Sequence, residues 1–230
     1  MKYYHVFDVD GTLTPSRGTI DPKFAEWFVE FCQNNLVYLV TGSDRAKTLE
    51  QLGKNVYNAC AKVYQCSGSV VYIADCRVQT LDWKIPETGH QWLENELKRS
   101  EFVLRTGNHI EERPGMVNFS IVGRNCTLGE RKLYVKWDQE NNERNSIADR
   151  FNANFPGITA RVGGETGLDI FPTGCDKSQI LRDFEDGHVV FFGDAMHKQG
   201  NDYPLAAANA GTNHAVQNWQ HTWQLLKEIA

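Results

Sequence analysis

The chain has 230 residues, of which 41% are hydrophobic and 23% are charged, values that fit one globular domain or a core domain with a smaller insert. Its net charge of −5 gives no general attraction to nucleic acid, and no apolar run approaches the roughly 18 residues of a membrane helix. We therefore expect no nucleic-acid partner and no membrane partner.

The N-terminal sequence and the cysteines bear on location. The first residues lack the long apolar stretch and the small-residue cleavage site of a signal peptide. The six cysteines include no Cys-x-x-Cys pair, the spacing that is common in metal and redox sites. We expect free thiols and a cytoplasmic location.

The first predicted elements are a strand and a helix. Residues 3–9 form a short apolar run that ends in carboxylates, which is typical of a buried strand. Asp21 followed by Pro22 predicts a helix start, since proline is favoured at the first helical position. Aromatic residues then recur at the spacing of one helical face: Phe24, Trp27, Phe28 and Phe31.

The next elements continue the alternation of strand and helix. A second buried strand is predicted at residues 36–40, and Ser43 is expected to cap the helix that follows it. Apolar runs at 63–65 and 70–73 predict a third strand and a small hairpin. This alternation favours a parallel sheet that is covered by helices.

The pattern changes near residue 82, where helix and strand signals become mixed and are separated by Gly and Pro. Helices are predicted at 88–99 and 138–154. Strands are predicted at 102–105, 116–122, 158–162 and 167–171. These signals predict a separate inserted α+β domain, which we place at residues 83–172.

The parallel-sheet pattern returns after the insert. A helix is predicted from Lys177, a strand at 188–192 and a short strand near 214–216. A closing helix carries three apolar residues: Trp219, Trp223 and Leu226. The fold class that we predict is α/β, with a Rossmann-like parallel-sheet core formed by 1–82 and 173–230 and interrupted by the inserted α+β domain.

Polar side chains stand at the ends of three predicted strands. Asp8 and Asp10 end the first strand, two residues apart, so in extended geometry both side chains would point the same way. Thr41 and Asp194 follow two later strands. Ligands of open α/β sheets bind at the carboxyl ends of the strands, so we expect these groups to meet. With Asp202 on the loop beyond, they predict a site for Mg²⁺, a hard cation that favours oxygen ligands.

A lysine is also required for phosphoryl transfer, because the transferred group spreads negative charge over three oxygens. Lys177, at the start of a predicted core helix, is the candidate.

Two other interpretations of the Asp-x-Asp-Gly segment are weaker. A calcium loop would need a third oxygen ligand at its fifth position and Glu at its twelfth, whereas Thr12 and Thr19 stand there. A simple Asp-Gly turn does not account for the polar residues at the other strand ends.

Four segments together resemble the motifs of the haloacid dehalogenase (HAD) superfamily. In chain order they are Asp8-Val9-Asp10-Gly11-Thr12, Thr41, Lys177 and the stretch 193–202, which contains Gly193-Asp194 and Gly200-Asn201-Asp202. The insert lies where this superfamily often carries a cap domain. The resemblance implies a HAD core with an α+β cap of the C2B-like type.

Almost the whole chain resembles one family of that superfamily, the eukaryotic-type phosphomannomutases. The segments that carry the resemblance are 7–17, 113–131, 163–172, 174–177, 191–194 and 200–203. The resemblance implies Mg²⁺-dependent phosphoryl transfer through an aspartyl-phosphate on a hexose phosphate, from mannose 6-phosphate to mannose 1-phosphate.

The same resemblance implies roles for the core residues. Asp8 would attack phosphorus, and Asp10 would protonate the leaving oxygen and later deprotonate the incoming hydroxyl. Lys177 and Thr41 would hold the phosphoryl oxygens. Mg²⁺ would be held by Asp8, the Asp10 backbone carbonyl and Asp194, with Asp202 as a ligand or as a neighbour of the ligands.

Substrate recognition is assigned by the resemblance to Arg17 in the core and to five residues of the insert: Arg113, Asn118, Arg124, Arg131 and Asp169. The arginines would bind phosphate, because a planar guanidinium does so through two hydrogen bonds, and the other two would bind sugar hydroxyls. The implied partners are a sugar-phosphate substrate and a hexose bisphosphate activator. The resemblance also allows a homodimer through the cap.

Four positions depart from the mutase pattern. Thr41 stands where the mutases usually have Gly, Ser67-Gly68 where they have Asn-Gly, and Pro114 where Asn is frequent. Gly167 replaces a Ser that stands two residues before the insert aspartate, which removes a hydroxyl from an expected phosphate contact.

These departures keep a sugar-phosphate phosphatase open as the alternative function. Thr41 suits both activities and Gly167 weakens a distal phosphate site, whereas the insert arginines favour the mutase. A third interpretation, a non-catalytic protein that binds a phosphorylated ligand, gives no reason for the complete set of motif residues.

Overall fold

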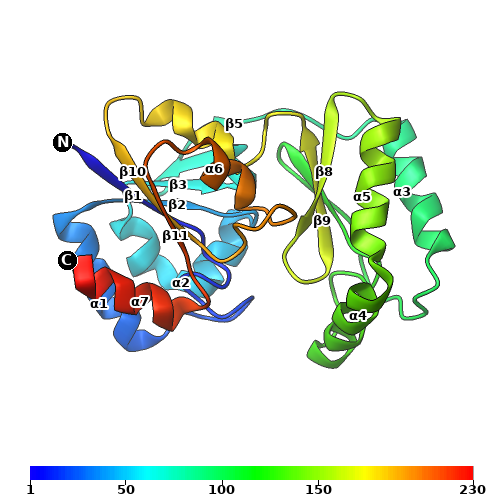
Figure 1. Ribbon diagram of the computed structural model, residues 1–230, viewed down its shortest axis with the longest axis horizontal. Coiled ribbons are helices and arrows are strands. Elements are labelled where there is room, and N and C mark those ends of the chain that lie inside the picture. Colours follow the sequence, from blue (N-terminus) through cyan, green and yellow to red (C-terminus); the bar gives the residue numbers. More distant parts are fainter. Residues whose placement is uncertain (230) are drawn as a thin grey trace. The chain divides into compact units, whose positions relative to one another are not determined.

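The chain forms two compact units in the computed structural model, which describes residues 1–229 (Figure 1). The core unit comprises Met1–Thr80, Gly174–Lys198 and the segment from Asp202 onward, and the insert unit comprises Leu81–Thr173 with Gln199–Asn201. A cap function for the insert stays a prediction. Among the described residues, no helix is long and apolar enough to cross a lipid bilayer.

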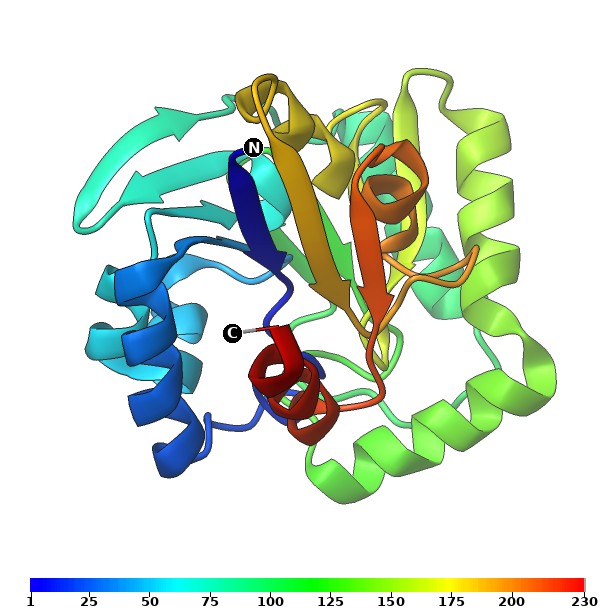
Figure 2. The ribbon, with the colours of Figure 1, turned by 60° about the vertical axis from the view of Figure 1, so that its left-hand side comes forward.

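Within residues 1–229, seven strands form the core sheet, in the order β11-β10-β1-β2-β3-β4-β5. The strands are β1 (Tyr3–Phe7), β2 (Leu36–Val40), β3 (Lys62–Gln65), β4 (Val70–Ile73), β5 (Cys76–Thr80), β10 (His188–Gly193) and β11 (Thr212–Ala215). The pairs from β11 to β3 are parallel, and β4 and β5 add an antiparallel edge. Figure 2 shows β1, β10 and β11 side by side. The predicted α/β fold class with a mainly parallel sheet is confirmed.

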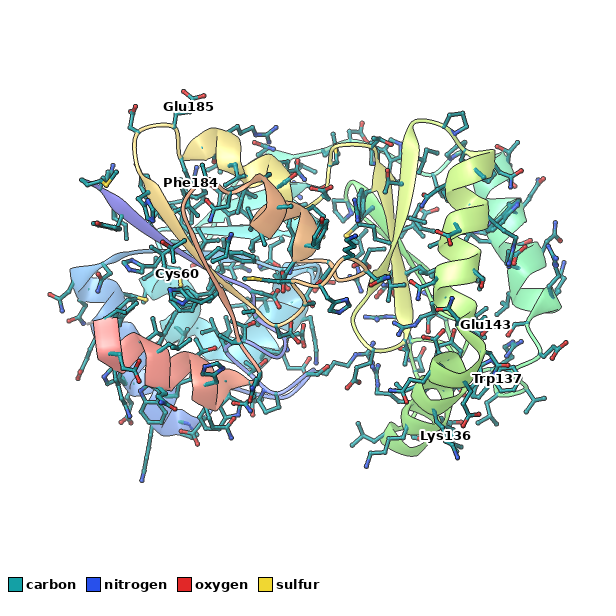
Figure 3. All side chains as sticks on the ribbon, in the orientation of Figure 1. Cys60, Lys136, Trp137, Glu143, Phe184 and Glu185 are labelled. Atoms are coloured by element: carbon teal, nitrogen blue, oxygen red, sulfur yellow. The ribbon has the colours of Figure 1, made fainter. Side chains whose placement is uncertain are left out.

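Helices cover both faces of the core sheet. One face packs against α1 (Pro22–Asn34), α2 (Arg45–Ala59) and α7 (Trp219–Ile229), and the other against the 3-10 segment η2 (Lys177–Asp183) and α6 (Tyr203–Ala208). Along β1, Phe7 faces the first group and Val6 the second, as the period of two of a strand requires. Cys60 and Phe184, labelled in Figure 3, belong to these two apolar clusters.

The start of α1 agrees with the prediction, and the start of α2 corrects one. The Asp21 side chain accepts hydrogen bonds from the first backbone N–H groups of α1, and the predicted phenylalanines are buried. The expectation that Ser43 caps the next helix is wrong. Asp44 is the cap, because α2 begins at Arg45 and the Asp44 carboxylate accepts from Lys47 N–H at 2.8 Å.

The segment after the insert also differs from the prediction. The helix predicted from Lys177 is a short 3-10 segment, not an α-helix. The Asp176 carboxylate accepts from both the backbone N–H and the hydroxyl of Ser178, and such local bonds compete with α-helical bonding. The short helix α6 was not predicted.

The insert is an antiparallel sheet with helices on one face (Figure 1). Within residues 81–173, four strands pair in the order β6-β7-β9-β8. They are β6 (Ile110–Arg113), β7 (Met116–Phe119), β8 (Ile158–Gly163) and β9 (Gly167–Pro172), with helices α3 (Glu87–Arg99), α4 (Leu128–Asn141) and α5 (Glu143–Asn154). Val117, Phe119 and Ile170 pack against Leu93 and Phe151 of these helices, so the opposite face of the sheet carries no helix of the insert.

Two predictions for the insert are corrected, and one strand was missed. The single helix at 138–154 is two helices, because Asn142 adopts a left-handed conformation (φ 52°) that ends α4. The strand at 102–105 is absent from the described chain, since Phe102 packs on the Tyr134 ring at 5.0 Å without pairing to a strand, while the Arg105 guanidinium bonds nearby carbonyls. Strand β6 was not predicted.

Candidate active site

The first candidate segment begins where β1 ends. The backbone N–H of Asp8 donates to the Phe192 carbonyl of β10 at 2.9 Å. Two residues on, Asp10 bridges to Thr14, and Gly11 N–H donates to the Thr14 carbonyl at 2.9 Å. Asp10 therefore lies outside β1, at a turn, and the expected common direction of the two carboxylates along one strand does not apply.

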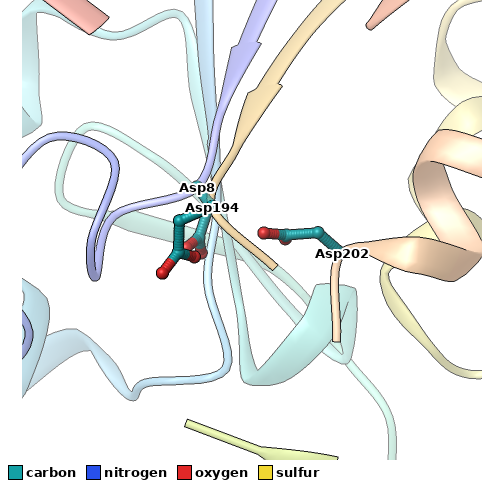
Figure 4. A group of neighbouring side chains, drawn as sticks. All are labelled: Asp8, Asp194 and Asp202. Atoms are coloured by element: carbon teal, nitrogen blue, oxygen red, sulfur yellow. The ribbon is translucent and has the colours of Figure 1, made fainter. Parts of the chain in front are cut away.

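Three carboxylates gather at the ends of the parallel strands. One oxygen from each of Asp8, Asp194 and Asp202 lies within 4.8 Å of the other two. Figure 4 shows the Asp202 carboxylate directed toward the other two. Asp8 and Asp202 are buried, and Asp194 is exposed. The Asp10 carboxylate is not a member of this cluster, and its predicted metal contact was through the backbone carbonyl.

Lys177 joins two of these carboxylates. Its Nζ lies 2.6 Å from Asp8 Oδ1 and 2.7 Å from Asp202 Oδ1, and its side chain is 1% exposed. The second Asp202 oxygen accepts from Ala195 N–H at 3.0 Å. Both Asp202 oxygens are thus bonded to protein donors, which makes Asp202 better suited to orient Lys177 than to bind a metal directly.

The charge of this cluster points to a further cation. Burial alone would lower the pKa of Lys177, but Asp202 and Asp8 outweigh it and raise that pKa. Burial raises the pKa of Asp8, opposed by Lys177. Partial burial of the carboxylate, and then the neighbouring charge of Asp202, raise the pKa of Asp194 to about 6. One ammonium cannot neutralise three carboxylates, and a divalent cation would.

Gly11 makes room for Asp194. Its φ is +77°, and a Cβ there would lie about 2.2 Å from Asp194 Oδ2, far inside van der Waals contact. Any side chain at this position would displace the carboxylate, so the glycine is required by the site and by the left-handed turn together.

Asp10 is held by two donors. Its Oδ1 accepts from Arg17 N–H at 2.6 Å and from Gln51 Nε2 at 2.9 Å. Gln51 is 1% exposed and comes from α2, so a residue distant in sequence orients the predicted acid/base. Because these bonds engage one carboxylate oxygen, the other can meet a substrate oxygen.

Thr41 stands at the end of β2 with a buried side chain. Its Oγ1 accepts from Ser43 N–H at 3.1 Å. This bond uses the oxygen as an acceptor, so the hydroxyl hydrogen can donate to a phosphoryl oxygen.

The two insert residues that are predicted to bind sugar hydroxyls, Asn118 and Asp169, contact each other. Asn118 on β7 and Asp169 on β9 are paired across the strands, and Asn118 Nδ2 donates to Asp169 Oδ1 at 2.7 Å. Both side chains are buried, and Asn118 Oδ1 has no hydrogen-bond partner among the described residues. A buried acceptor without a partner is costly, so a donor from a ligand would stabilise it.

The three predicted insert arginines are not solvated surface residues. Arg113 and Arg124 both pair with Glu111, at 2.5 and 3.0 Å, and Arg131 is 6% exposed and pairs with Glu165 at 3.0 Å. Burial, and then the nearby Arg113 charge, lowers the pKa of Arg124. Packing of like charges in one region is typical of an anion site.

Three residues that the structure places beside these groups have no role predicted from sequence: Gln51, Glu111 and Glu165. For Gln51 a signal existed, since it shares the buried face of α2 with Thr48 and Leu52, where a polar residue needs a partner. Glu111 stands in a charged stretch and Glu165 in a glycine-rich one, and neither pattern indicates a partner.

Known proteins resemble this chain over almost its full length. A family model described as eukaryotic phosphomannomutase matches residues 24–230. The phosphomannomutase of Spinacia oleracea is 33% identical over 240 residues, which cover 97% of this chain and 94% of that protein. The phosphomannomutase of Saccharomyces cerevisiae is 32% identical over 235 residues, with 97% and 92% covered.

Solved structures share the fold at low sequence identity. A sugar phosphatase of HAD subclass IIB superposes with a TM-score of 0.61 at 14% identity, covering 100% of this chain and 99% of that one. The IMP-nucleotidase of Plasmodium falciparum gives a TM-score of 0.65 at 15% identity, covering 99% and 68%. At such identities the likeness establishes the fold alone.

Proposed function

This chain belongs to the eukaryotic phosphomannomutase family and is an enzyme of the HAD superfamily. We propose that it is a Mg²⁺-dependent phosphohexomutase that interconverts mannose 6-phosphate and mannose 1-phosphate. The observation that carries the proposal is the buried contact of Lys177 with Asp8 at the strand ends, beside Asp194 and Asp202. A buried lysine that bonds a buried carboxylate is suited to phosphoryl transfer, because the ammonium stabilises charge on the transferred group.

In this proposal Asp8 is the nucleophile. Its carboxylate attacks phosphorus, the bond to the leaving sugar oxygen breaks, and an aspartyl-phosphate forms. Lys177, within 2.6 Å of Asp8, would neutralise the phosphoryl oxygens, and the Thr41 hydroxyl would donate to one of them. The phosphoryl group then passes to the other hydroxyl of a hexose phosphate.

Asp10 is the proposed acid/base. With one oxygen fixed by Gln51 and the Arg17 backbone, the other would give a proton to the leaving oxygen and later take one from the attacking hydroxyl. The two bonds hold the side chain in one orientation, which both proton transfers need.

Mg²⁺ fits the donor set of the core cluster. Asp8, Asp194 and the Asp10 carbonyl would hold it, with Asp202 bonded to Lys177 beside them. When bound, the ion would neutralise charge on the phosphoryl group and on the crowded carboxylates.

Recognition of the sugar phosphate is proposed for Arg17 and for the insert residues: Arg113, Asn118, Arg124, Arg131 and Asp169. The grouping of the insert residues and the burial of Asn118, Arg131 and Asp169 support this role, as does the unpartnered Asn118 oxygen. A hexose bisphosphate would act as the activator that phosphorylates Asp8, and a homodimer through the insert is a further proposal from the family.

A sugar-phosphate phosphatase is the second candidate. Thr41 and Gly167 favour it, since both depart from the mutase pattern and Gly167 provides no hydroxyl near Asp169. A phosphatase would transfer the phosphoryl group from Asp8 to water.

One assay separates these functions. The enzyme is given α-mannose 1-phosphate, Mg²⁺ and mannose 1,6-bisphosphate, and both mannose 6-phosphate and inorganic phosphate are followed. A mutase forms mannose 6-phosphate much faster than phosphate. Release of phosphate alone would replace the mutase with the phosphatase.

A further inference from the structure

The helix-free face of the insert sheet carries a row of polar residues straight across its four strands. Cross-strand pairing places Glu111 opposite Asn118, Asn118 opposite Asp169, and Asp169 opposite Arg161. Residues that are paired in this way share one face, because side chains alternate along each strand. Arg161 on β8 therefore lies on the same face as Asn118 and Asp169, the two residues that are proposed to bind sugar hydroxyls.

Arg161 differs from the other arginines of this region in having no carboxylate partner. Arg124 pairs with Glu111 and Arg131 with Glu165. In the described part of the chain no ion pair involves Arg161, and its Nε is buried without a hydrogen-bond partner. A buried guanidinium donor that the protein leaves unbonded is costly unless a ligand bonds it.

The cross-strand partner of Arg161 is engaged elsewhere. The Asp169 carboxylate accepts from Asn118, and its Oδ2 lies about 2.4 Å from where a Cβ of Gly163 would be. Asp169 thus occupies the space above Gly163 and is bonded toward β7. This arrangement leaves the Arg161 charge for a bound anion.

Gly167 lies on the same face, next to Asn118. A Cβ at this position would lie about 2.7 Å from Asn118 Nδ2, so the Asn118 amide fills the space that a side chain would take. The hydroxyl that the mutase pattern carries at this position is missing, and on the neighbouring strand β8 the Arg161 guanidinium supplies donors on the same face. Arginine can contribute two hydrogen bonds to phosphate, where a hydroxyl contributes one.

We propose that Arg161 is a specificity-determining residue of the insert, which binds the phosphate group of a hexose bisphosphate that is not being transferred. The inference rests on the proposed function, since it concerns the substrate of that reaction. Arg161 then makes the contact with an anion that Gly167, which has no side chain, cannot make. Because this contact needs a second phosphate group, the insert binds a hexose bisphosphate more tightly than a ligand with a single phosphate.

Binding is measured by calorimetry in an Asp8→Asn background, where no phosphoryl transfer consumes the ligand. Arg161→Ala is compared with Arg99→Ala, an exposed arginine of α3 that pairs with Glu96 at 2.9 Å. We expect Arg161→Ala to weaken binding of mannose 1,6-bisphosphate at least about tenfold, as for loss of one charged hydrogen bond, and binding of inorganic phosphate less than about twofold. Arg161→Lys should recover part of the loss, because it keeps the charge.

Equal affinities of Arg161→Ala and Arg99→Ala for the bisphosphate would overturn the inference. An equal loss for bisphosphate and inorganic phosphate would do the same, because it would show a general structural effect; melting temperatures of the variants check that point. The proposed function fails separately, if the unmutated enzyme forms no mannose 6-phosphate in the transfer assay.

Discussion

Lys177 Nζ lies 2.6 Å from Asp8 Oδ1, and both side chains are buried. The two residues are 169 positions apart in the chain, on either side of the insert. The contact joins the segment after the insert to the proposed nucleophile. The stability of the core and the proposed phosphoryl transfer therefore depend on the same pair of residues.

Replacement of the lysine should therefore affect folding as well as activity. Lys177→Met leaves Asp8 and Asp202 buried without their cation, and removal of one partner of a buried pair costs about 3–5 kcal/mol. The free energy of unfolding in urea measures this. The control is Lys62→Met, whose partner Asp183 is partly exposed, with an expected cost below about 1 kcal/mol. Equal losses in the two variants would show that the buried contact of Lys177 does not stabilise the core more than an exposed ion pair does.

The carboxylate cluster should make stability depend on pH when no metal is bound. The pKa of Asp194 rises from 3.8 to about 6, so between these values the folded protein binds a proton that the unfolded chain releases. The stability of the metal-free protein should then decrease as the pH rises through this window, and added Mg²⁺ should stabilise it more above pH 6 than below. Urea unfolding from pH 4 to pH 7 checks both.

Asp194→Asn serves as the control for that pH series. It removes the titrating carboxyl, so its stability should fall less steeply over the same window and respond less to Mg²⁺. If the variant and the unmutated protein show the same slope, the raised pKa of Asp194 is not the cause.

Gln51 is predicted to support turnover through Asp10. Gln51→Leu removes the Nε2 donor at 2.9 Å but keeps a similar volume, so we expect kcat to fall about tenfold with little change in KM, as for one lost hydrogen bond to a charged group. Steady-state kinetics measures this. Gln91→Leu, on the exposed surface of α3, should leave kcat unchanged. An unaltered kcat in Gln51→Leu would show that Asp10 needs no such support.

Introduction of the serine that the mutase pattern has at position 167 should lower the stability of the insert. Gly167→Ser places a Cβ about 2.7 Å from Asn118 Nδ2, which its bond to Asp169 holds in place. Because the amide can move away only by losing that bond, we expect a cost of about 1–3 kcal/mol. Thermal unfolding measures the loss. Gly129→Ser, where a Cβ meets nothing closer than 3.8 Å, should change stability by less than about 0.5 kcal/mol. If Gly167→Ser is as stable as this control, Asn118 does not fill the site.

The core fold could be predicted from sequence because its elements carry local signals. The strands β1, β2 and β10 are apolar runs, and Asp21-Pro22 marks the start of α1. The elements of the insert were harder to predict from sequence. Strand β6 has the sequence Ile-Glu-Glu-Arg, whose charges hide its pairing, and the break between α4 and α5 depends on a single left-handed Asn142.

The motif residues of the core could also be named from sequence, and the structure brings Asp8, Lys177, Asp194 and Asp202 together. Their partners could not be named. The bond from Gln51 to Asp10 and the pairing of Arg161 opposite Asp169 depend on how distant segments meet, which no local pattern encodes. Residues that act through tertiary contacts are the ones that sequence reasoning misses.

Asp8 is the proposed carrier of the phosphoryl group, and trapping of the phosphorylated enzyme tests this role. The protein is mixed with Mg²⁺ and radiolabelled mannose 1,6-bisphosphate, quenched in acid and digested, and the labelled peptide is identified. We predict label on the peptide that contains Asp8, its loss on treatment with hydroxylamine, and no label in Asp8→Asn, while Asp75→Asn, at an exposed aspartate, is labelled normally. Label on another residue, or equal labelling of Asp8→Asn, would show that Asp8 is not the nucleophile.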